Sequence, residues 1–205
     1  MKKILVIVDV QNDFIDGSLG TKEAKEIIPN IVEKINDNCY EKIFVTLDTH
    51  DINYLKTEEG RFLPQPHCVK YTKGWLINEN ILYSLSNENY KTIEKRTFGC
   101  EKLIRDIRNE INRSKIKQND LIIELVGVCT DICVITNALM IKSHFPNIKV
   151  AIDTKCCAGS TQEAHEEAIR IMRGCMIDVD SCNYKNSSFD NNSEIEDIND
   201  WLATL

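Results

Sequence analysis

The chain has 205 residues, 42% of them hydrophobic, which is enough to form the core of one large domain. Its net charge of -7 argues against general affinity for nucleic acid, and its apolar runs stay well below the roughly 18 residues of a membrane span. The nine cysteines include no C-x-x-C pair, and a chain of this length does not need disulfides. We therefore expect free thiols, no structural zinc site of the usual spacing, and a cytoplasmic protein.

The first half of the chain predicts two buried strands separated by a helix. Residues 4–8 and 43–47 are short, nearly continuous apolar runs, typical of strands that are buried on both faces. Apolar residues at helical spacing predict a helix over 27–35. Residues 51–90 show no sustained period, so we expect a long loop there, and such loops in compact domains are often functional.

The second half continues the alternation of strands and helices. The pattern predicts strands at 91–94, 121–126 and 149–153, and helices near 103–111, 131–143 and 161–173. Such alternation favours an α/β domain with an open, mainly parallel sheet and helices on both faces. We expect this domain to span residues 1–182, followed over 183–205 by a polar linker and a short helix.

Residues 127–134, Gly-Val-Cys-Thr-Asp-Ile-Cys-Val, predict a tight turn between a buried strand and a helix. The turn places Cys133 in the first helical turn, where free backbone N–H groups and the helix dipole favour a thiolate. A thiolate is the nucleophilic form of cysteine. The alternative is that Cys133 is a small apolar core residue, as most cysteines are.

Polar residues also end two of the other predicted strands. Asp9 follows the first strand, and Asp48 and His50 follow the second. Ligands of open α/β sheets bind outside the carboxyl ends of the strands, so these groups are expected to converge in one crevice. Asp9 taken alone is equally well explained as a turn or cap residue.

Three segments together resemble the signatures of the isochorismatase-like cysteine hydrolases. These segments are residues 8–14, 95–99 and 127–134, and residues 48–50 with 66–68 resemble the metal motif of the nicotinamidase branch. The match extends from about residue 4 to residue 179. The resemblance implies an isochorismatase-like fold of Rossmann-like, three-layer type, and an amide hydrolase activity.

The resemblance also implies catalytic roles. Cys133 would be the nucleophile, Asp9 would accept and return its proton, and Lys95 would hold both by its charge. The family places a cis peptide at Val128–Cys129, and the N–H groups of Cys129 and Cys133 would form the oxyanion hole. A thioester would form, ammonia would leave, and water would release the acid. Without the motif, Lys95 would be interpreted as a solvated surface lysine.

A metal site is implied by the second motif. Asp48, His50 and His67 would bind one divalent ion, with Zn²⁺ favoured and Fe²⁺ or Mn²⁺ possible. Many nicotinamidases add a fourth ligand between the two histidines, and glutamate fills that position in part of the family. We expect Glu59 to fill it here, with Glu58 or water as alternatives, or both glutamates as part of a solvated acidic loop.

The expected substrate pocket is apolar. Phe14, Leu19 and Phe98 would form its walls under the resemblance. Many nicotinamidases carry a tryptophan three residues before the histidine at position 67, and this chain has Pro64 there. The tryptophan of those enzymes packs on the substrate ring, and Pro64 supplies no such contact.

The resemblance favours hydrolysis of nicotinamide to nicotinate and ammonia with a bound metal. The alternative is a related cysteine amidase that acts on a carbamoyl or ureido group, which Pro64 supports. A non-catalytic metal-binding or redox-sensing protein is the third and least favoured hypothesis. We expect a small-molecule amide as partner, no nucleic acid or membrane, and a possible homo-oligomer, because many relatives are oligomers.

Overall fold

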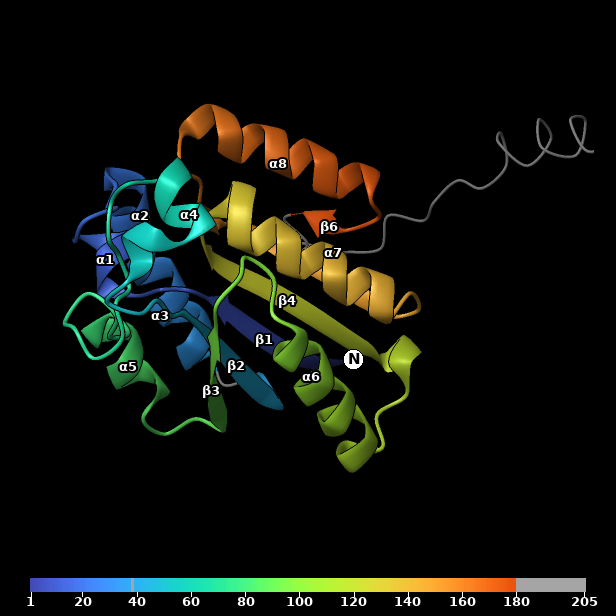
Figure 1. Ribbon diagram of the computed structural model, residues 1–205. Helices are drawn as coiled ribbons and strands as arrows, with labels where there is room; N and C mark the ends of the chain where they lie inside the picture. Colours follow the sequence, from blue (N-terminus) through green and yellow to red (C-terminus); the bar gives the residue numbers. More distant parts are fainter. Residues whose placement is uncertain (38, 180–205) are drawn as a thin grey trace, which may run out of the picture.

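The computed structural model describes residues 1–37 and 39–179, which form a six-stranded sheet with helices on both faces (Figure 1). Every strand pairing is parallel. The strands are β1 (Lys2–Val8), β2 (Lys42–Asp48), β3 (Tyr90–Lys95), β4 (Leu121–Val128), β5 (Lys149–Ala158) and β6 (Asp178–Val179). The α/β architecture expected from the alternating pattern is therefore confirmed.

The strand order is β3-β2-β1-β4-β5-β6. Successive strands are added on one side of β1 up to β3, and from β4 onward they are added on the other side. At such a reversal, the loops after the two central strands diverge and leave a crevice at their carboxyl ends. The fold therefore places a binding site beside the ends of β1 and β4.

Two apolar cores flank the sheet. One contains the inner sides of α6 (Glu101–Ser114), α7 (Ile135–His144) and α8 (Gln162–Gly174). The other contains α1 (Asn12–Ile15), α2 (Lys22–Glu26), α3 (Ile28–Asn36) and α5 (Glu79–Leu85). Because the central strands are covered on both faces, their sequences are continuous apolar runs rather than alternating ones.

The region 51–90 differs from the expected loop. It contains the short helices η1 (Tyr54–Lys56), α4 (Glu58–Phe62) and α5. The side chains of Thr57 and Asn78 cap α4 and α5, and Ile81 and Leu85 anchor α5 in the core. Two of these helices are shorter than two turns, so they present too few apolar repeats for a periodicity to be visible.

The helix predicted over 131–143 begins differently. A π-helical turn, η3 (Thr130–Val134), precedes α7, so Cys133 lies in this turn rather than in the first turn of an α-helix. A further short helix, η2 (Gln118–Asp120), leads into β4.

The predicted linker and terminal helix within 183–205 lie outside the described residues. None of the helices in the described part of the chain combines the length and apolar character that a membrane crossing requires. The cysteines of residues 1–37 and 39–179 are all free thiols, as expected.

Candidate active site

The carboxyl ends of four strands bring distant polar residues together. Asp9 follows β1, Asp48 ends β2, Lys95 ends β3, and Cys129 follows β4. Asp48 and Lys95 are direct neighbours in the parallel ladder between β2 and β3. Side chains that are separated by up to 120 positions in sequence thereby share one edge of the sheet, as the strand-end pattern predicted.

A cleft of about 1040 Å³ opens over this edge. The residues expected to bind metal and substrate all line it, together with the two cysteines of the turn: Phe14, Leu19, Asp48, His50, Glu59, His67, Phe98, Cys129 and Cys133. Asp9 and Lys95 are fully or almost fully buried. The Cys133 thiol therefore faces the cleft, and the buried charges of Asp9 and Lys95 lie beneath it.

The ammonium group of Lys95 is the centre of that buried cluster. Its Nζ lies 2.8 Å from Asp9 Oδ2, 3.2 Å from Asp48 Oδ1 and 3.5 Å from Cys133 Sγ. Burial lowers the pKa of Lys95, but the charges of Asp9, Cys133 and Asp48 outweigh burial and raise it. Lys95 therefore remains charged, and the single ammonium joins the cysteine to both carboxylates.

The pKa values of the Asp9 carboxyl and of the Cys133 thiol are both raised. Burial raises the pKa of the Asp9 carboxyl, and the Lys95 charge offsets this only in part. Burial, with the charge of Asp9, also raises the pKa of the Cys133 thiol well above its usual value. The expectation of a resting thiolate is therefore wrong, because desolvation of the sulfur outweighs the favourable charges. A thiol with such a pKa would have to lose its proton before it could act as a nucleophile, and Asp9 is the neighbouring carboxyl group.

Asp9 is held by a residue that the sequence analysis did not identify. Thr46 donates a hydrogen bond from its hydroxyl to Asp9 Oδ1 over 2.7 Å, and its carbonyl accepts the Asp9 backbone N–H over 3.2 Å. Asp9 has a φ of 52°, which is unusual for a residue other than glycine. Thr46 carries a hydroxyl in a strand that is buried on both faces, where a hydroxyl needs a hydrogen-bond partner. This polar residue in an apolar run is the sequence signal that could have identified it.

The turn that carries Cys133 needs a glycine at its start. Gly127 has a φ of 119°, and a Cβ atom there would collide with the Val8 carbonyl oxygen of the neighbouring strand. The peptide bond Val128–Cys129 is cis, as the resemblance implied. Asn137 donates from its side-chain amide to the Cys133 carbonyl over 2.8 Å. The backbone around the nucleophile candidate is thus fixed from both sides.

A second cluster occupies the other part of the cleft floor. One ligand atom each from Asp48, His50, Glu59 and His67 lies within 4.8 Å of the other three, so the group is able to hold a metal ion. Asp48 Oδ2 is 2.9 Å from His50 Nε2 and 3.5 Å from His67 Nε2. Glu59 Oε1 is 3.7 Å and 3.8 Å from the same two nitrogens. One carboxylate, Asp48, therefore faces Lys95 with one oxygen and this cluster with the other.

The cluster has supporting contacts of the kind that orient metal ligands. His67 Nδ1 lies 2.9 Å from the Gln65 carbonyl, which directs Nε2 toward the cluster. The buried side chain of Gln11 accepts from the Asp48 N–H over 2.7 Å and donates to the Asp48 carbonyl over 2.9 Å. Burial raises the pKa of Asp48, but His50, His67 and Lys95 reverse this and lower it, so Asp48 is a carboxylate.

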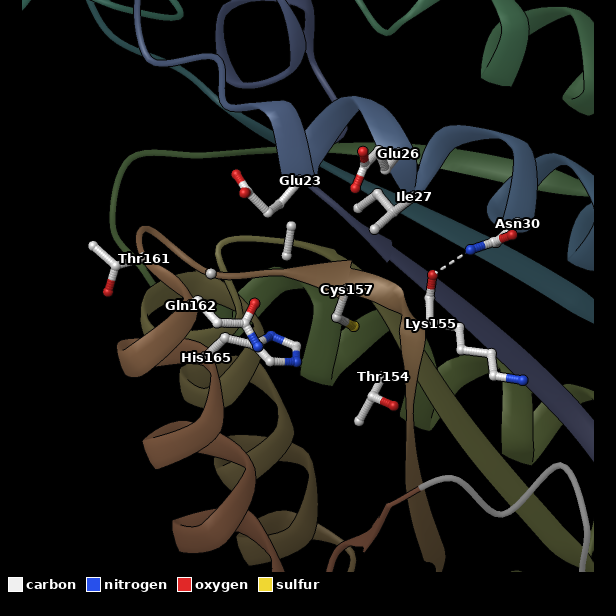
Figure 2. Close-up of a pocket in the computed structure, with 12 residues that line it drawn as sticks. Glu23, Glu26, Ile27, Asn30, Thr154, Lys155, Cys157, Thr161, Gln162 and His165 are labelled. Carbon is white, nitrogen blue, oxygen red and sulfur yellow. Dashed lines mark hydrogen bonds between the residues drawn. The ribbon is translucent and has the colours of Figure 1, made fainter.

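Two contacts join the cysteine turn to the loop after β5 and to α8. Asp131 accepts from the Ser160 N–H over 2.7 Å and from its hydroxyl over 2.6 Å, and Thr130 Oγ1 lies 2.8 Å from His165 Nδ1. His165 also lines a smaller hollow of about 360 Å³ between α2 and α8 (Figure 2). Gly159 lines both this hollow and the cleft. The loop after β5 therefore separates the two hollows and supports the turn.

The wall near α4 differs from the expected pocket. Pro64 is exposed and stands outside the lining of the cleft, whereas Phe62, Leu63 and Ile132 line it. Sequence analysis missed Phe62 and Leu63 because α4 itself was not predicted. Ile132 lies in the turn that carries Cys133, and its place in the lining was not expected either.

Comparison with known proteins identifies the class of this protein. Residues 3–181 match the isochorismatase domain, and the chain belongs to the isochorismatase family of hydrolases. Among its relatives, the nicotinamidase of Schizosaccharomyces pombe is 27% identical over 206 residues, covering 85% of this chain and 91% of that protein.

Solved structures give the same family. The crystal structure of nicotinamidase/pyrazinamidase PncA from Bacillus subtilis matches with a TM-score of 0.70 at 25% identity, covering 87% of this chain and 99% of that one. Pyrazinamidase of Pyrococcus horikoshii in complex with zinc also has a TM-score of 0.70 and 25% identity, with 87% and 98% coverage. The relatives named here are thus all nicotinamidases or pyrazinamidases.

Proposed function

We propose that this protein is a metal-dependent nicotinamidase that converts nicotinamide and water into nicotinate and ammonia. The observation that carries the proposal is the position of Lys95, whose ammonium contacts both Cys133 and Asp48. A nucleophile candidate and a metal-type cluster therefore share the floor of one cleft. The nicotinamidase relatives support the choice of substrate.

The first chemical step uses the buried pair beneath the cleft. The Cys133 sulfur attacks the amide carbon while its proton passes to the Asp9 carboxylate, whose raised pKa makes it a stronger base. The carbonyl π electrons move to oxygen, and the N–H groups of Cys129 and Cys133 stabilise that charge. Lys95 stays protonated and offsets the negative charge that moves between sulfur and carboxylate.

The second and third steps return the site to its starting state. Asp9 gives its proton to the amide nitrogen, the C–N bond breaks, and ammonia departs. A thioester remains on Cys133. Water then attacks the thioester while Asp9 takes a proton from it. The C–S bond breaks, Asp9 gives this proton to the departing sulfur, and the acid releases its remaining proton to solvent and leaves as nicotinate.

The donor set fits a divalent cation. Two imidazoles and two carboxylates on converging atoms are suitable ligands for Zn²⁺, Fe²⁺ or Mn²⁺. We propose that Asp48, His50, Glu59 and His67 hold such an ion. When bound, the ion would act as a Lewis acid toward the ring nitrogen of the substrate and so would help to fix the orientation of the ring.

The test is ammonia release from nicotinamide and from benzamide, which lacks the ring nitrogen. We expect nicotinamide to react at least about 10²-fold faster, and chelation to abolish most of that advantage until zinc is restored. Equal rates for the two amides, or full nicotinamide turnover by metal-free protein, would contradict the proposal.

A matched pair of variants tests the metal ligands directly. Glu58 and Glu59 are neighbours on α4, but only Glu59 belongs to the cluster. Glu59→Gln should weaken zinc binding by about tenfold or more, and Glu58→Gln should leave zinc binding close to that of the unaltered protein. Similar losses in both would assign the effect to general charge rather than to ligation.

A second candidate, an amidase for carbamoyl or ureido groups, is favoured by one observation. Pro64 contributes no aromatic wall at the place where many nicotinamidases carry tryptophan, since it lies outside the cleft. Such an enzyme would release ammonia from ureido compounds faster than from nicotinamide. The same amide panel therefore separates the two functions.

A redox-sensing role for Cys129 or Cys156 is opposed by the burial of these two thiols. Burial raises the pKa of Cys129 and of Cys156 to about 12, so both are protonated near neutral pH. Protonated thiols react slowly with oxidants.

A further inference from the structure

The cleft is much larger than nicotinamide requires. Its volume of about 1040 Å³ matches the upper end of the roughly 300–1,000 Å³ of pockets that enclose drug-sized ligands. A single ring with one amide would occupy only the floor, next to Cys133 and the metal-type cluster. The remaining space lies toward the mouth.

The mouth carries large apolar side chains. Phe62, Leu63 and Phe98 line the cleft while remaining 85%, 39% and 49% exposed. They come from two separate segments, α4 and the loop after β3. Exposed apolar side chains that gather at one opening, beside a reactive floor, mark a surface for an apolar part of a ligand.

The mouth is connected to the floor through α4. Glu59 and Phe62 are three residues apart on this helix and therefore lie on the same side of it. Leu63 donates its N–H to the Glu59 carbonyl over 2.8 Å, and its own carbonyl accepts the Tyr54 hydroxyl over 2.9 Å. The Tyr54 ring packs against the rings of His50 and His67 at 4.7 Å and 5.0 Å. Phe62 thus projects from the same side of α4 as the cluster residue Glu59.

The proposed chemistry fixes which edge of the substrate ring faces this mouth. The ring nitrogen is directed to the cluster that contains Asp48, and the amide carbon to Cys133. Both residues contact the Lys95 ammonium, at 3.2 Å and 3.5 Å, so both anchors are on the floor. Carbon 2 of the ring lies between these two anchors. Carbon 5 is opposite carbon 2 and points outward.

The charges at the mouth select against anions. Arg96 is paired with Asp51 at 3.0 Å, and Glu58 adds a further carboxylate to the lining. From these observations we propose that the protein hydrolyses nicotinamides with an uncharged apolar group at ring carbon 5, and that Phe62 determines this specificity. The inference rests on the proposed nicotinamidase function and extends its substrate class.

The experiment uses three probes: nicotinamide, 5-phenylnicotinamide, and nicotinamide with a carboxylate at carbon 5. Their binding to the zinc-loaded Cys133→Ala protein is measured by calorimetry, and their kcat/KM is measured with the zinc-loaded unaltered protein. We expect the phenyl compound to bind about tenfold more tightly than nicotinamide, because a second aromatic ring becomes buried. The carboxylate compound should bind more weakly than nicotinamide.

Phe62→Ala, made in both backgrounds, tests the specificity role. We expect it to reduce the ratio of phenyl compound to nicotinamide by about fivefold to tenfold, in binding and in kcat/KM. Ile52→Ala is the matched control, because Ile52 is 89% exposed in the neighbouring segment and lies outside the lining of the cleft. It should leave that ratio unchanged.

Two results would overturn the inference alone. One is an unaltered protein that hydrolyses nicotinamide but neither binds nor hydrolyses the phenyl compound. The other is an unchanged ratio in Phe62→Ala. A protein that hydrolyses neither compound would overturn the proposed function as well.

Discussion

Two buried lysines occupy charge centres of similar composition in different parts of the sheet. Lys95 contacts the carboxylates of Asp9 and Asp48 at 2.8 Å and 3.2 Å. Lys34 contacts the carboxylates of Glu124 and Asp153 at 2.8 Å and 2.7 Å. In both centres burial lowers the lysine pKa, and the two carboxylates reverse this and raise it.

The surroundings of the two centres differ. Lys34 projects from α3 onto the middle of β4 and β5, and the Tyr40 hydroxyl donates to Glu124 over 2.7 Å. Lys95 stands at the strand ends, where its ammonium also contacts Cys133 below an open cleft. In both centres, two carboxylates therefore stabilise one buried ammonium group. We propose that such a group serves chemistry only where a nucleophile and a route for substrate lie beside it.

The largest effect should follow removal of the group that distinguishes the two centres. Cys133→Ala should reduce nicotinamide turnover by at least about 10³-fold, because the nucleophile is lost. The free energy of unfolding should change little by comparison. Ammonia release and urea unfolding measure the two effects.

The control is the neighbouring thiol. Cys129→Ala keeps the backbone N–H that we assign to the oxyanion hole and should cost less than about tenfold in turnover. A comparable loss in the two variants would refute the assignment of Cys133 as the nucleophile.

The second prediction replaces each of the two lysines by methionine in turn. Lys34→Met leaves two buried carboxylates without their cation and should lower the free energy of unfolding by about 3–5 kcal/mol. The kcat/KM of the folded fraction should be unchanged, because this centre is remote from the cleft. Lys95→Met should lower stability too, and turnover by at least about 10²-fold. Loss of kcat/KM in folded Lys34→Met would remove the distinction between the centres.

The smallest effect is a shift in the reactivity of Cys133 with pH. Its raised pKa predicts slow alkylation by iodoacetamide near pH 7, with a rate that increases above pH 9. Lys95 lowers the thiol pKa against the larger effect of burial, so Lys95→Met should move the profile to higher pH. The Lys34→Met profile should coincide with that of the unaltered protein. A profile in Lys95→Met that moves to lower pH would contradict the contact between ammonium and sulfur.

Much of the fold was predictable because its information is local. The strands at 4–8, 43–47 and 121–126 are apolar runs that only a sheet covered on both faces accommodates, and the structure places them at its centre. The convergence of Asp9, Asp48 and Cys133 followed from the same argument, since parallel strands end at one edge. Short helices such as α4 were not predictable, because a single turn has no period.

The sequence by itself determined the α/β architecture, the strand ends that carry polar groups, and the resemblance that singled out Lys95. Only the tertiary structure decided that Lys95 is buried, that Thr46 holds Asp9, and that Phe62 stands at the mouth of the cleft. It also reversed the expected pKa shift of Cys133. The physical reason is that desolvation and contact depend on every segment packed around an atom, whereas a sequence pattern records only its neighbours along the chain.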